Sequence, residues 1–331
     1  MKVPFRTLKD YKFLLNEIIA VPKFVNFFIT SDCTCRCVMC NFWRQDKKYV
    51  TFAKFKECVD TLADNFGFNN FSLTGGEPLL HPQYFTFINY IKERGFYANS
   101  PTNGTLLTEN NVRKLKESRI DSIGLSIDSL NPKIADGNRR HPNQLKKALN
   151  GLNLLNKYEI PCYVIVILAK HNIHEFCDMV RFFDEKYDTS TMLCFPDEGV
   201  GPLKEILFSK DEFLSFIDEL LELKKQGYRI VNATKYLQEL KNAYLGKPRE
   251  IPCFGGYYVV NVYWDGTVKP CFNRKSFGDL ARIEGFDKRK CNMCLNQCFI
   301  EQSYISESVA QRKFLTILKT QLSVFKMQMR L

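Results

Sequence analysis

Short apolar segments alternate with amphipathic segments from residue 24 to residue 195, and this alternation constrains the fold more than any other feature. Segments typical of β-strands cover residues 24–30, 70–74, 96–99, 121–127, 161–168 and 191–195. Segments with a helical apolar period cover residues 51–65, 83–94, 109–118, 143–157 and 173–186. Strands that alternate with helices pair in parallel through right-handed crossovers. The pattern predicts an α/β fold of about six strand–helix units, fewer than the eight of a closed barrel.

The first of two cysteine groups follows directly on the segment 24–30. Cys33, Cys37 and Cys40 have the spacing C-x3-C-x2-C, and Cys35 falls outside it. Clustered thiols in a cytoplasmic chain indicate metal or redox chemistry rather than disulfides. Three thiolates suit zinc, copper(I) or an iron–sulfur cluster. A structural zinc site has four protein ligands, whereas three thiols leave one position of a metal centre open. The alternatives are incidental buried thiols and a zinc site that is completed elsewhere.

The segment 70–74 ends in Thr74-Gly75-Gly76-Glu77-Pro78, where two glycines allow a close approach of the backbone to a ligand. By itself this motif is equally compatible with an ordinary turn. Following C-x3-C-x2-C, it resembles the radical S-adenosylmethionine (radical SAM) superfamily. The resemblance implies that Cys33, Cys37 and Cys40 hold a [4Fe–4S] cluster whose open iron takes the amino and carboxylate groups of SAM. It also implies a partial (β/α)6 TIM-like barrel in which Gly75, Gly76, Glu77 and Pro78 bind the methionine amino group.

Further SAM contacts are expected at later strand ends. The resemblance places Thr102 and Asn103 near the ribose, and Ser126 and Asp128 in the SAM pocket. Arg139 or Arg140 is a candidate for binding the methionine carboxylate through a fork of donors. The alternative for both arginines is a solvated charge on a loop.

The second cysteine group contains Cys253, Cys271, Cys291, Cys294 and Cys298. Asp265-Gly266 lies between the apolar run 257–264 and residues 267–269, which predicts a β-hairpin that brings Cys253 and Cys271 together. The group resembles the SPASM and twitch auxiliary domains of radical SAM enzymes, and its short length implies one auxiliary [4Fe–4S] cluster. Which four of the five thiols bind it stays open. Spacing alone also fits a zinc ribbon.

The predicted organisation has five parts. They are an N-terminal helix (1–21), a radical SAM partial barrel (22–210), a helical bridge (211–250), a small α+β auxiliary domain (251–300) and a basic amphipathic C-terminal helix (301–331). The formal charge of +11 favours anionic partners. The two terminal helices are expected either to cap the barrel or to lie on an anionic membrane. The protein is expected to be cytoplasmic, with membrane association as the alternative.

These features predict a radical SAM oxidoreductase or transferase that cleaves SAM reductively to a deoxyadenosyl radical. That radical takes hydrogen from an unidentified substrate, in a net oxidation or a modification of a peptide, sugar or lipid-linked molecule. A flavodoxin or ferredoxin is expected to supply electrons. A non-catalytic iron–sulfur sensor or nucleic-acid-binding protein is the alternative. This alternative does not explain the motif Gly75-Gly76-Glu77-Pro78 after the first cysteine loop. Nucleic acid is therefore not an expected partner.

Overall fold

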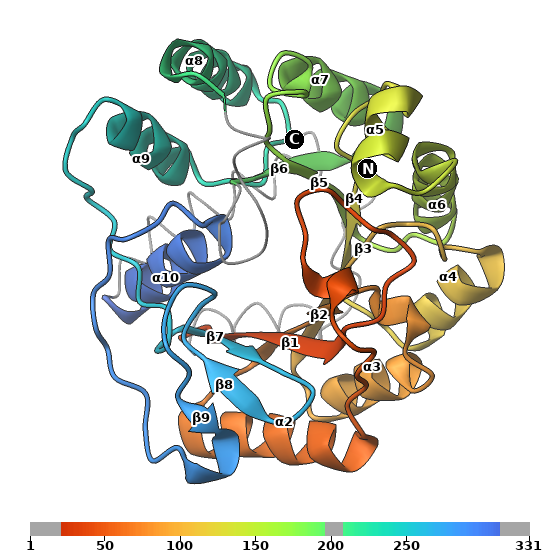
Figure 1. Cartoon of the computed structure of the whole chain (residues 1–331), viewed down its shortest axis with the longest axis vertical. Helices are drawn as coiled ribbons and strands as arrows, with labels where there is room; N and C mark the ends of the chain where they lie inside the picture. Colours follow the sequence, from red (N-terminus) through yellow and green to blue (C-terminus); the bar gives the residue numbers. More distant parts are fainter. Residues whose placement is uncertain (1–20, 196–207, 312–331) are drawn as a thin grey trace.

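The computed structural model describes residues 21–195 and 208–311, which form a curved sheet with helices around it (Figure 1). The strands are β1 (Phe24–Thr30), β2 (Asn70–Gly75), β3 (Tyr97–Thr102), β4 (Ser122–Ser126), β5 (Cys162–Ile167), β6 (Ser190–Cys194), β7 (Val259–Val262), β8 (Thr267–Lys269) and β9 (Gly278–Asp279). Strands β1 to β6 lie side by side in chain order and pair in parallel. The sheet does not close on itself, so the expected partial barrel is confirmed.

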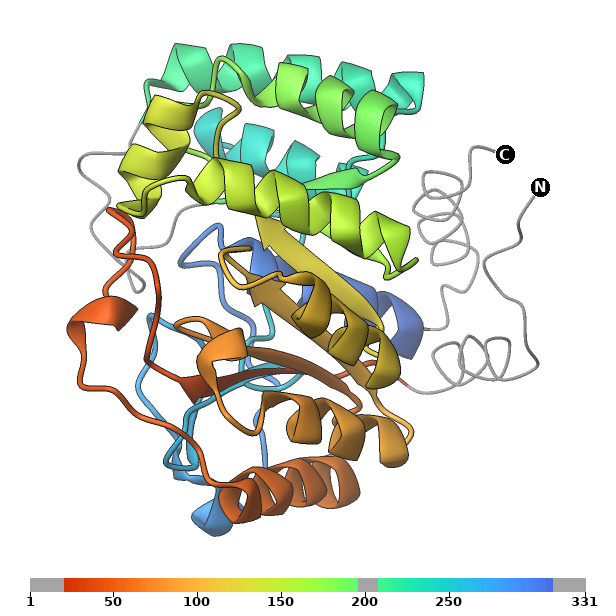
Figure 2. The ribbon, with the colours of Figure 1, turned by 90° about the vertical axis from the view of Figure 1, so that its right-hand side faces the viewer.

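The helices surround the sheet, and most of them lie on its outside (Figures 1 and 2). They are α2 (Phe52–Phe66), α3 (Tyr84–Glu93), α4 (Glu109–Glu117), α5 (Pro132–Arg139), α6 (Gln144–Lys157), α7 (Phe176–Tyr187), α8 (Lys210–Gln226), α9 (Thr234–Tyr244) and α10 (Gln297–Ala310). Helix α2 illustrates how they form. The Thr51 side chain accepts a hydrogen bond from the Lys54 amide, and Gly67 ends the helix in the left-handed conformation. Its apolar face, which includes Phe55 and Leu62, is buried in the core.

Helix α5 was not expected from the sequence, although its start signal is present. Asn131 caps the helix by accepting a hydrogen bond from the Lys133 amide, and Pro132 occupies the first turn. The helix is short and contains Gly137, so its apolar period is weak. It matters because the Asn138 and Arg139 carbonyls accept hydrogen bonds from the Val38 and Arg36 amides. Helix α5 therefore holds the first cysteine loop.

The expected hairpin is present as β7 and β8, and it continues the barrel sheet. Strand β7 pairs in parallel with β1 on the side opposite β2, and β8 and β9 follow it in antiparallel pairing. At the other edge, Ile230 forms a parallel bridge with Thr191 of β6, and Asn232 continues this pairing through its side chain. Its side chain accepts from the Leu193 amide at 2.7 Å and donates to the Leu193 carbonyl at 2.9 Å. Helix α10 packs against both β6 and β7 and occupies the opening between them (Figure 1).

Three expected features fall wholly or partly outside the described residues: the N-terminal helix, residues 196–207 of the expected barrel segment, and the C-terminal helix beyond residue 311. Within residues 21–195 and 208–311, no helix combines the length and apolar character that crossing a bilayer requires.

Candidate active site

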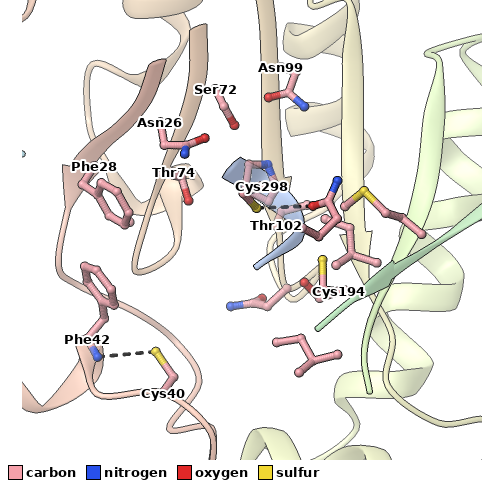
Figure 3. Close-up of a pocket in the computed structure, with 18 of the residues that line it drawn as sticks. Asn26, Phe28, Cys40, Phe42, Ser72, Thr74, Asn99, Thr102, Cys194 and Cys298 are labelled. Atoms are coloured by element: carbon pink, nitrogen blue, oxygen red, sulfur yellow. Dashed lines mark hydrogen bonds between the residues drawn. The ribbon is translucent and has the colours of Figure 1, made fainter. Parts of the chain in front are cut away.

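A cavity of about 420 Å³ opens at the carboxyl ends of the strands, and both predicted cofactor motifs reach it. Its size is within the range of small-molecule sites. The wall is mostly apolar and carries hydroxyl, amide and thiol groups. Figure 3 shows Asn26, Ser72 and Asn99 directed into the cavity from the sheet, with Cys40 and Phe42 some distance below them.

The first cysteine group reaches this cavity from the loop after β1. Cys33, Cys37 and Cys40 all line the wall. Each sulfur already accepts a hydrogen bond. Asn103 Nδ2 donates to Cys33 at 3.7 Å, Arg139 Nη1 to Cys37 at 3.9 Å, and the Phe42 amide to Cys40 at 3.4 Å. Such N–H donors also stabilise the sulfur ligands of a metal cluster. The three expected thiols therefore have the surroundings of cluster ligands.

Cys35 also lies in this loop, fully buried. Its hydrogen bond to Cys37, together with the charge of Arg139, lowers the pKa of the Cys37 thiol to about 6 despite its burial. Burial raises the pKa of the Cys40 thiol to about 11. Within the described residues, no group of three or more Cys, His, Asp or Glu side chains is arranged to hold a single metal ion.

Gly75 and Gly76 line the cavity next to the cysteine loop and touch its backbone. The Gly76 amide donates to the Thr30 carbonyl at 2.8 Å, and the Glu77 amide donates to the Asp32 carbonyl at 2.7 Å. A Cβ atom on Gly76 would lie 2.1 Å from the Asp32 carbonyl oxygen. Glycine is required here because the turn and the loop are in contact.

The Glu77 carboxylate does not line the cavity. It is fully buried and accepts hydrogen bonds from Thr102 Oγ1 at 2.7 Å and from the Asn103 amide at 2.9 Å. Pro78 is buried beside it in the short helix η2 (Pro78–Leu80). Because Asn103 also contacts Cys33, Glu77 joins the glycine turn to the cysteine loop through the end of β3. Burial raises the pKa of Glu77 to about 7, although its hydrogen bonds favour the charged form.

This pKa leads to a testable pH dependence of stability. A folded-state pKa above the usual value of 4.5 means that the contribution of Glu77 to stability is full below about pH 4.5 and is lost as pH rises towards about 7. The shift corresponds to about 3 kcal/mol. We expect Glu77→Gln to reduce the loss of unfolding free energy between pH 5 and pH 8, measured by urea titration of the metal-free protein. Glu301→Gln is the comparison, since burial also raises the pKa of Glu301 to about 7. An unchanged pH profile in both variants would contradict the assignment.

Arg139 lines the cavity and is the one charged residue among the described residues that do so. It is buried, and its Nη2 lies 2.7 Å from Asp128 Oδ2. That approach is not aligned as a hydrogen bond, and within the described residues Arg139 Nε has no hydrogen-bond partner. A buried guanidinium with unused donors fits a carboxylate ligand. Arg140 ends α5, is exposed and lies outside the cavity wall.

Of the residues expected to contact SAM, Thr102, Asn103 and Ser126 line the cavity, whereas Asp128 is buried and pairs with Arg139. Gln144, at the start of α6, fixes two of these strand ends. Its side-chain amide donates to the carbonyls of Asn103 and Ser126, at 2.7 and 3.1 Å. The ends of β3 and β4 are therefore held together at the mouth of the barrel.

The second cysteine group separates into two parts. Cys253 and Cys291 exchange backbone hydrogen bonds of 3.0 and 2.9 Å, and the thiols of Cys271 and Cys294 lie near enough to influence the pKa of Cys253. Cys298, in the first turn of α10, instead lines the large cavity. Four thiols are thus gathered, and the fifth lies in the cavity wall.

Sequence reasoning did not identify several residues of the cavity wall. Cys194 at the end of β6, Asn99 on β3 and Tyr163 on β5 face the cavity, and Asn99 donates to the Tyr163 hydroxyl at 3.0 Å. A polar residue or thiol in or at the end of a predicted parallel strand is the signal that could have indicated them.

The barrel is open, and its carboxyl mouth carries thiols and a glycine turn. This arrangement is typical of barrel proteins that bind a cofactor at that end of the strands. Residues 27–183 match the model of the Radical SAM superfamily, so the chain contains a radical SAM domain. The cofactors of this superfamily are a [4Fe–4S] cluster and S-adenosylmethionine.

Individual relatives are distant. The AdoMet-dependent heme synthase of Methanosarcina barkeri is 29% identical over 157 residues, 46% of this chain and 45% of that protein. The chain thus spans less than half of that relative's length. The structure of anSMEcpe with bound AdoMet has a TM-score of 0.64 at 16% identity, over 90% of this chain and 99% of the other. SuiB of Streptococcus suis, bound to the precursor peptide SuiA, has a TM-score of 0.64 at 15% identity, over 83% and 66%. These two structures share the fold.

Proposed function

We propose that this protein is an enzyme that cleaves SAM reductively and removes a hydrogen atom from a substrate held in the cavity. The observation that carries the proposal is that the three thiols, the two glycines and Arg139 all line one cavity. Cys33, Cys37 and Cys40 would hold the cluster. When bound, the cluster and SAM together supply an electron, and a carbon radical able to abstract hydrogen.

The chain's own residues orient SAM and exclude water. Arg139 would bind the methionine carboxylate through its guanidinium, whose Nε has no hydrogen-bond partner within the described residues, while Asp128 pairs with Nη2. Gly75 and Gly76 leave room for backbone contacts with the methionine amino group. Thr102, Asn103 and Ser126 would meet the ribose and the rest of the nucleoside. The apolar parts of the wall shield the reactive carbon from water.

Arg139→Lys tests this orientation. Lysine keeps the charge but loses the planar fork. A hydrogen bond to a charged group contributes about 1.5–3 kcal/mol, so SAM affinity should fall by about 10- to 100-fold. Equilibrium dialysis of the cluster-loaded protein measures it, and Arg140→Lys is the matched control because Arg140 is exposed. Equal SAM affinity in the two variants would argue against a role for Arg139.

Formation of 5′-deoxyadenosine tests the proposed function as a whole. Anaerobically reconstituted protein, reduced with dithionite in the presence of SAM, should produce 5′-deoxyadenosine and methionine. Protein that binds iron and SAM but forms neither product would overturn the proposal in favour of an iron–sulfur sensor.

For the substrate we favour a peptide, because the structural relative SuiB is described with a bound precursor peptide. Cys253, Cys271, Cys291 and Cys294 would hold one auxiliary cluster, which fits their grouping around the β7–β8 hairpin. We further propose that a flavodoxin or ferredoxin supplies electrons, and that the protein is cytoplasmic.

A further inference from the structure

Two cysteines from distant parts of the chain line the same cavity, whose described wall includes none of the four auxiliary thiols Cys253, Cys271, Cys291 and Cys294. Cys194 ends β6 and Cys298 begins α10, and Figure 3 shows both side chains directed into the cavity. The two thiols are close enough for the charge of one to raise the pKa of the other, although burial is the larger cause of the raised pKa of Cys194. Cys194 is therefore a protonated thiol with an intact S–H bond at neutral pH.

Apart from the thiols that would hold the cluster, the described wall offers no usual proton acceptor. It contains no carboxylate, histidine or lysine side chain, and its one charged group, Arg139, is a donor. Burial raises the pKa of the Tyr163 hydroxyl, so this group stays protonated and is not available to accept a proton. A substrate radical becomes an oxidised product by losing an electron and a proton, and the proton requires a base. The alternative is to gain a hydrogen atom, for which a thiol is well suited because its S–H bond is weak.

We propose that Cys194 and Cys298 form a hydrogen-donor site, which returns a hydrogen atom to a carbon radical formed in the cavity. This inference rests on the proposed radical chemistry and specifies its outcome. Helix α10 presents Cys298 opposite the end of β6 because it fills the opening between β6 and β7. The nearby Gln297 Oε1 accepts from the Cys298 thiol at 3.4 Å, which orients that S–H group within the wall.

The step balances without net oxidation of the substrate. One S–H bond breaks homolytically, its hydrogen atom forms a C–H bond on the substrate carbon, and a thiyl radical remains. One electron from a reduced iron–sulfur centre or an external one-electron donor, and one proton from solvent, restore the thiol. The substrate keeps its oxidation state and gains one solvent-derived hydrogen, which permits inversion at a stereocentre.

The first test maps the thiols without measuring activity. Cluster-loaded protein is treated anaerobically with iodoacetamide, a neutral alkylating agent, and the modified cysteines are identified by mass spectrometry. We expect alkylation of Cys298 and protection of Cys253, Cys271, Cys291 and Cys294, whereas Cys194 should react slowly because its protonated, buried thiol is a poor nucleophile. Protection of Cys298 by bound iron would overturn the assignment of this thiol to the cavity.

The second test needs no knowledge of the substrate. In D2O, with dithionite as reductant and no added thiol, both S–H groups become S–D and can quench the SAM-derived radical. We expect deuterium in the 5′-deoxyadenosine of the wild type, and a severalfold smaller deuterated fraction in Cys194→Ser or Cys298→Ser. Cys177→Ser is the matched control, because Cys177 is a buried thiol outside this cavity.

The outcomes separate this inference from the proposed function. Deoxyadenosine without deuterium, or with a deuterated fraction unchanged in both cavity variants, would overturn the hydrogen-donor site alone. If the wild type forms no deoxyadenosine, the proposed function fails, and with it the hydrogen-donor role.

Discussion

Cys37→Ala should abolish the formation of 5′-deoxyadenosine and remove the visible absorbance of the barrel cluster. The expected loss exceeds about 100-fold, because even residues that only orient a metal ligand contribute 10- to 100-fold. Cys37 lines the cavity and receives a hydrogen bond from Arg139, so its removal also leaves that guanidinium without one of its acceptors. Iron content, absorbance and deoxyadenosine are measured on the same anaerobic preparation.

Cys35→Ala is the matched control, since Cys35 lies in the same loop two residues earlier but outside the C-x3-C-x2-C spacing. We expect this variant to keep the barrel cluster and to cleave SAM. Cluster loss in Cys35→Ala with retention in Cys37→Ala would show that the ligand set has been assigned wrongly.

Gly76→Ala should destabilise the protein by about 3 kcal/mol or more, at the upper end of the cost of overpacking. The added methyl group would approach the Asp32 carbonyl oxygen to 2.1 Å and the Ser31 carbonyl oxygen to 2.7 Å. Both are backbone atoms, so the glycine turn and the cysteine loop must separate. Thermal unfolding of the metal-free protein measures the stability, and iron content after reconstitution reports on the loop.

Gly285→Ala is the control for this substitution. Its added methyl group would have no neighbour within 4 Å, and Gly285 has no positive φ. We expect wild-type stability and iron content. A Gly76→Ala protein that is as stable as Gly285→Ala would mean that the close contact between turn and loop does not exist in solution.

The fold could be predicted in large part because its signals are local. The apolar run 24–30 coincides with β1, and the other five expected barrel strands match within two residues at their starts. Helix α5 was missed because its signal is a cap and a proline rather than an apolar period. The cysteine loop and the glycine turn were recognisable because each is contiguous in sequence.

The arrangement within the site depends on contacts between distant residues. Nothing near Glu77 in sequence reveals that Thr102 and Asn103 bind its carboxylate. The orientation of α5 decides that Arg139, and not the adjacent Arg140, pairs with Asp128. Likewise, the spacing of Cys291, Cys294 and Cys298 does not indicate that the last of them lies on a helix facing the cavity.

The hairpin pairs with β1, the strand that leads into the first cysteine loop, and this has a consequence for how the chain can be divided. On β1, Phe28 stacks with Phe42 at 5.0 Å and with Tyr263 at 4.8 Å, and meets Phe272 edge-on at 6.0 Å. An aromatic column thus connects the residues next to Cys40 with those next to Cys271. Truncation ahead of Cys253 would expose one backbone edge of β1 and half of this column, and such edges promote aggregation. The shortest working version of this barrel therefore retains its auxiliary segment.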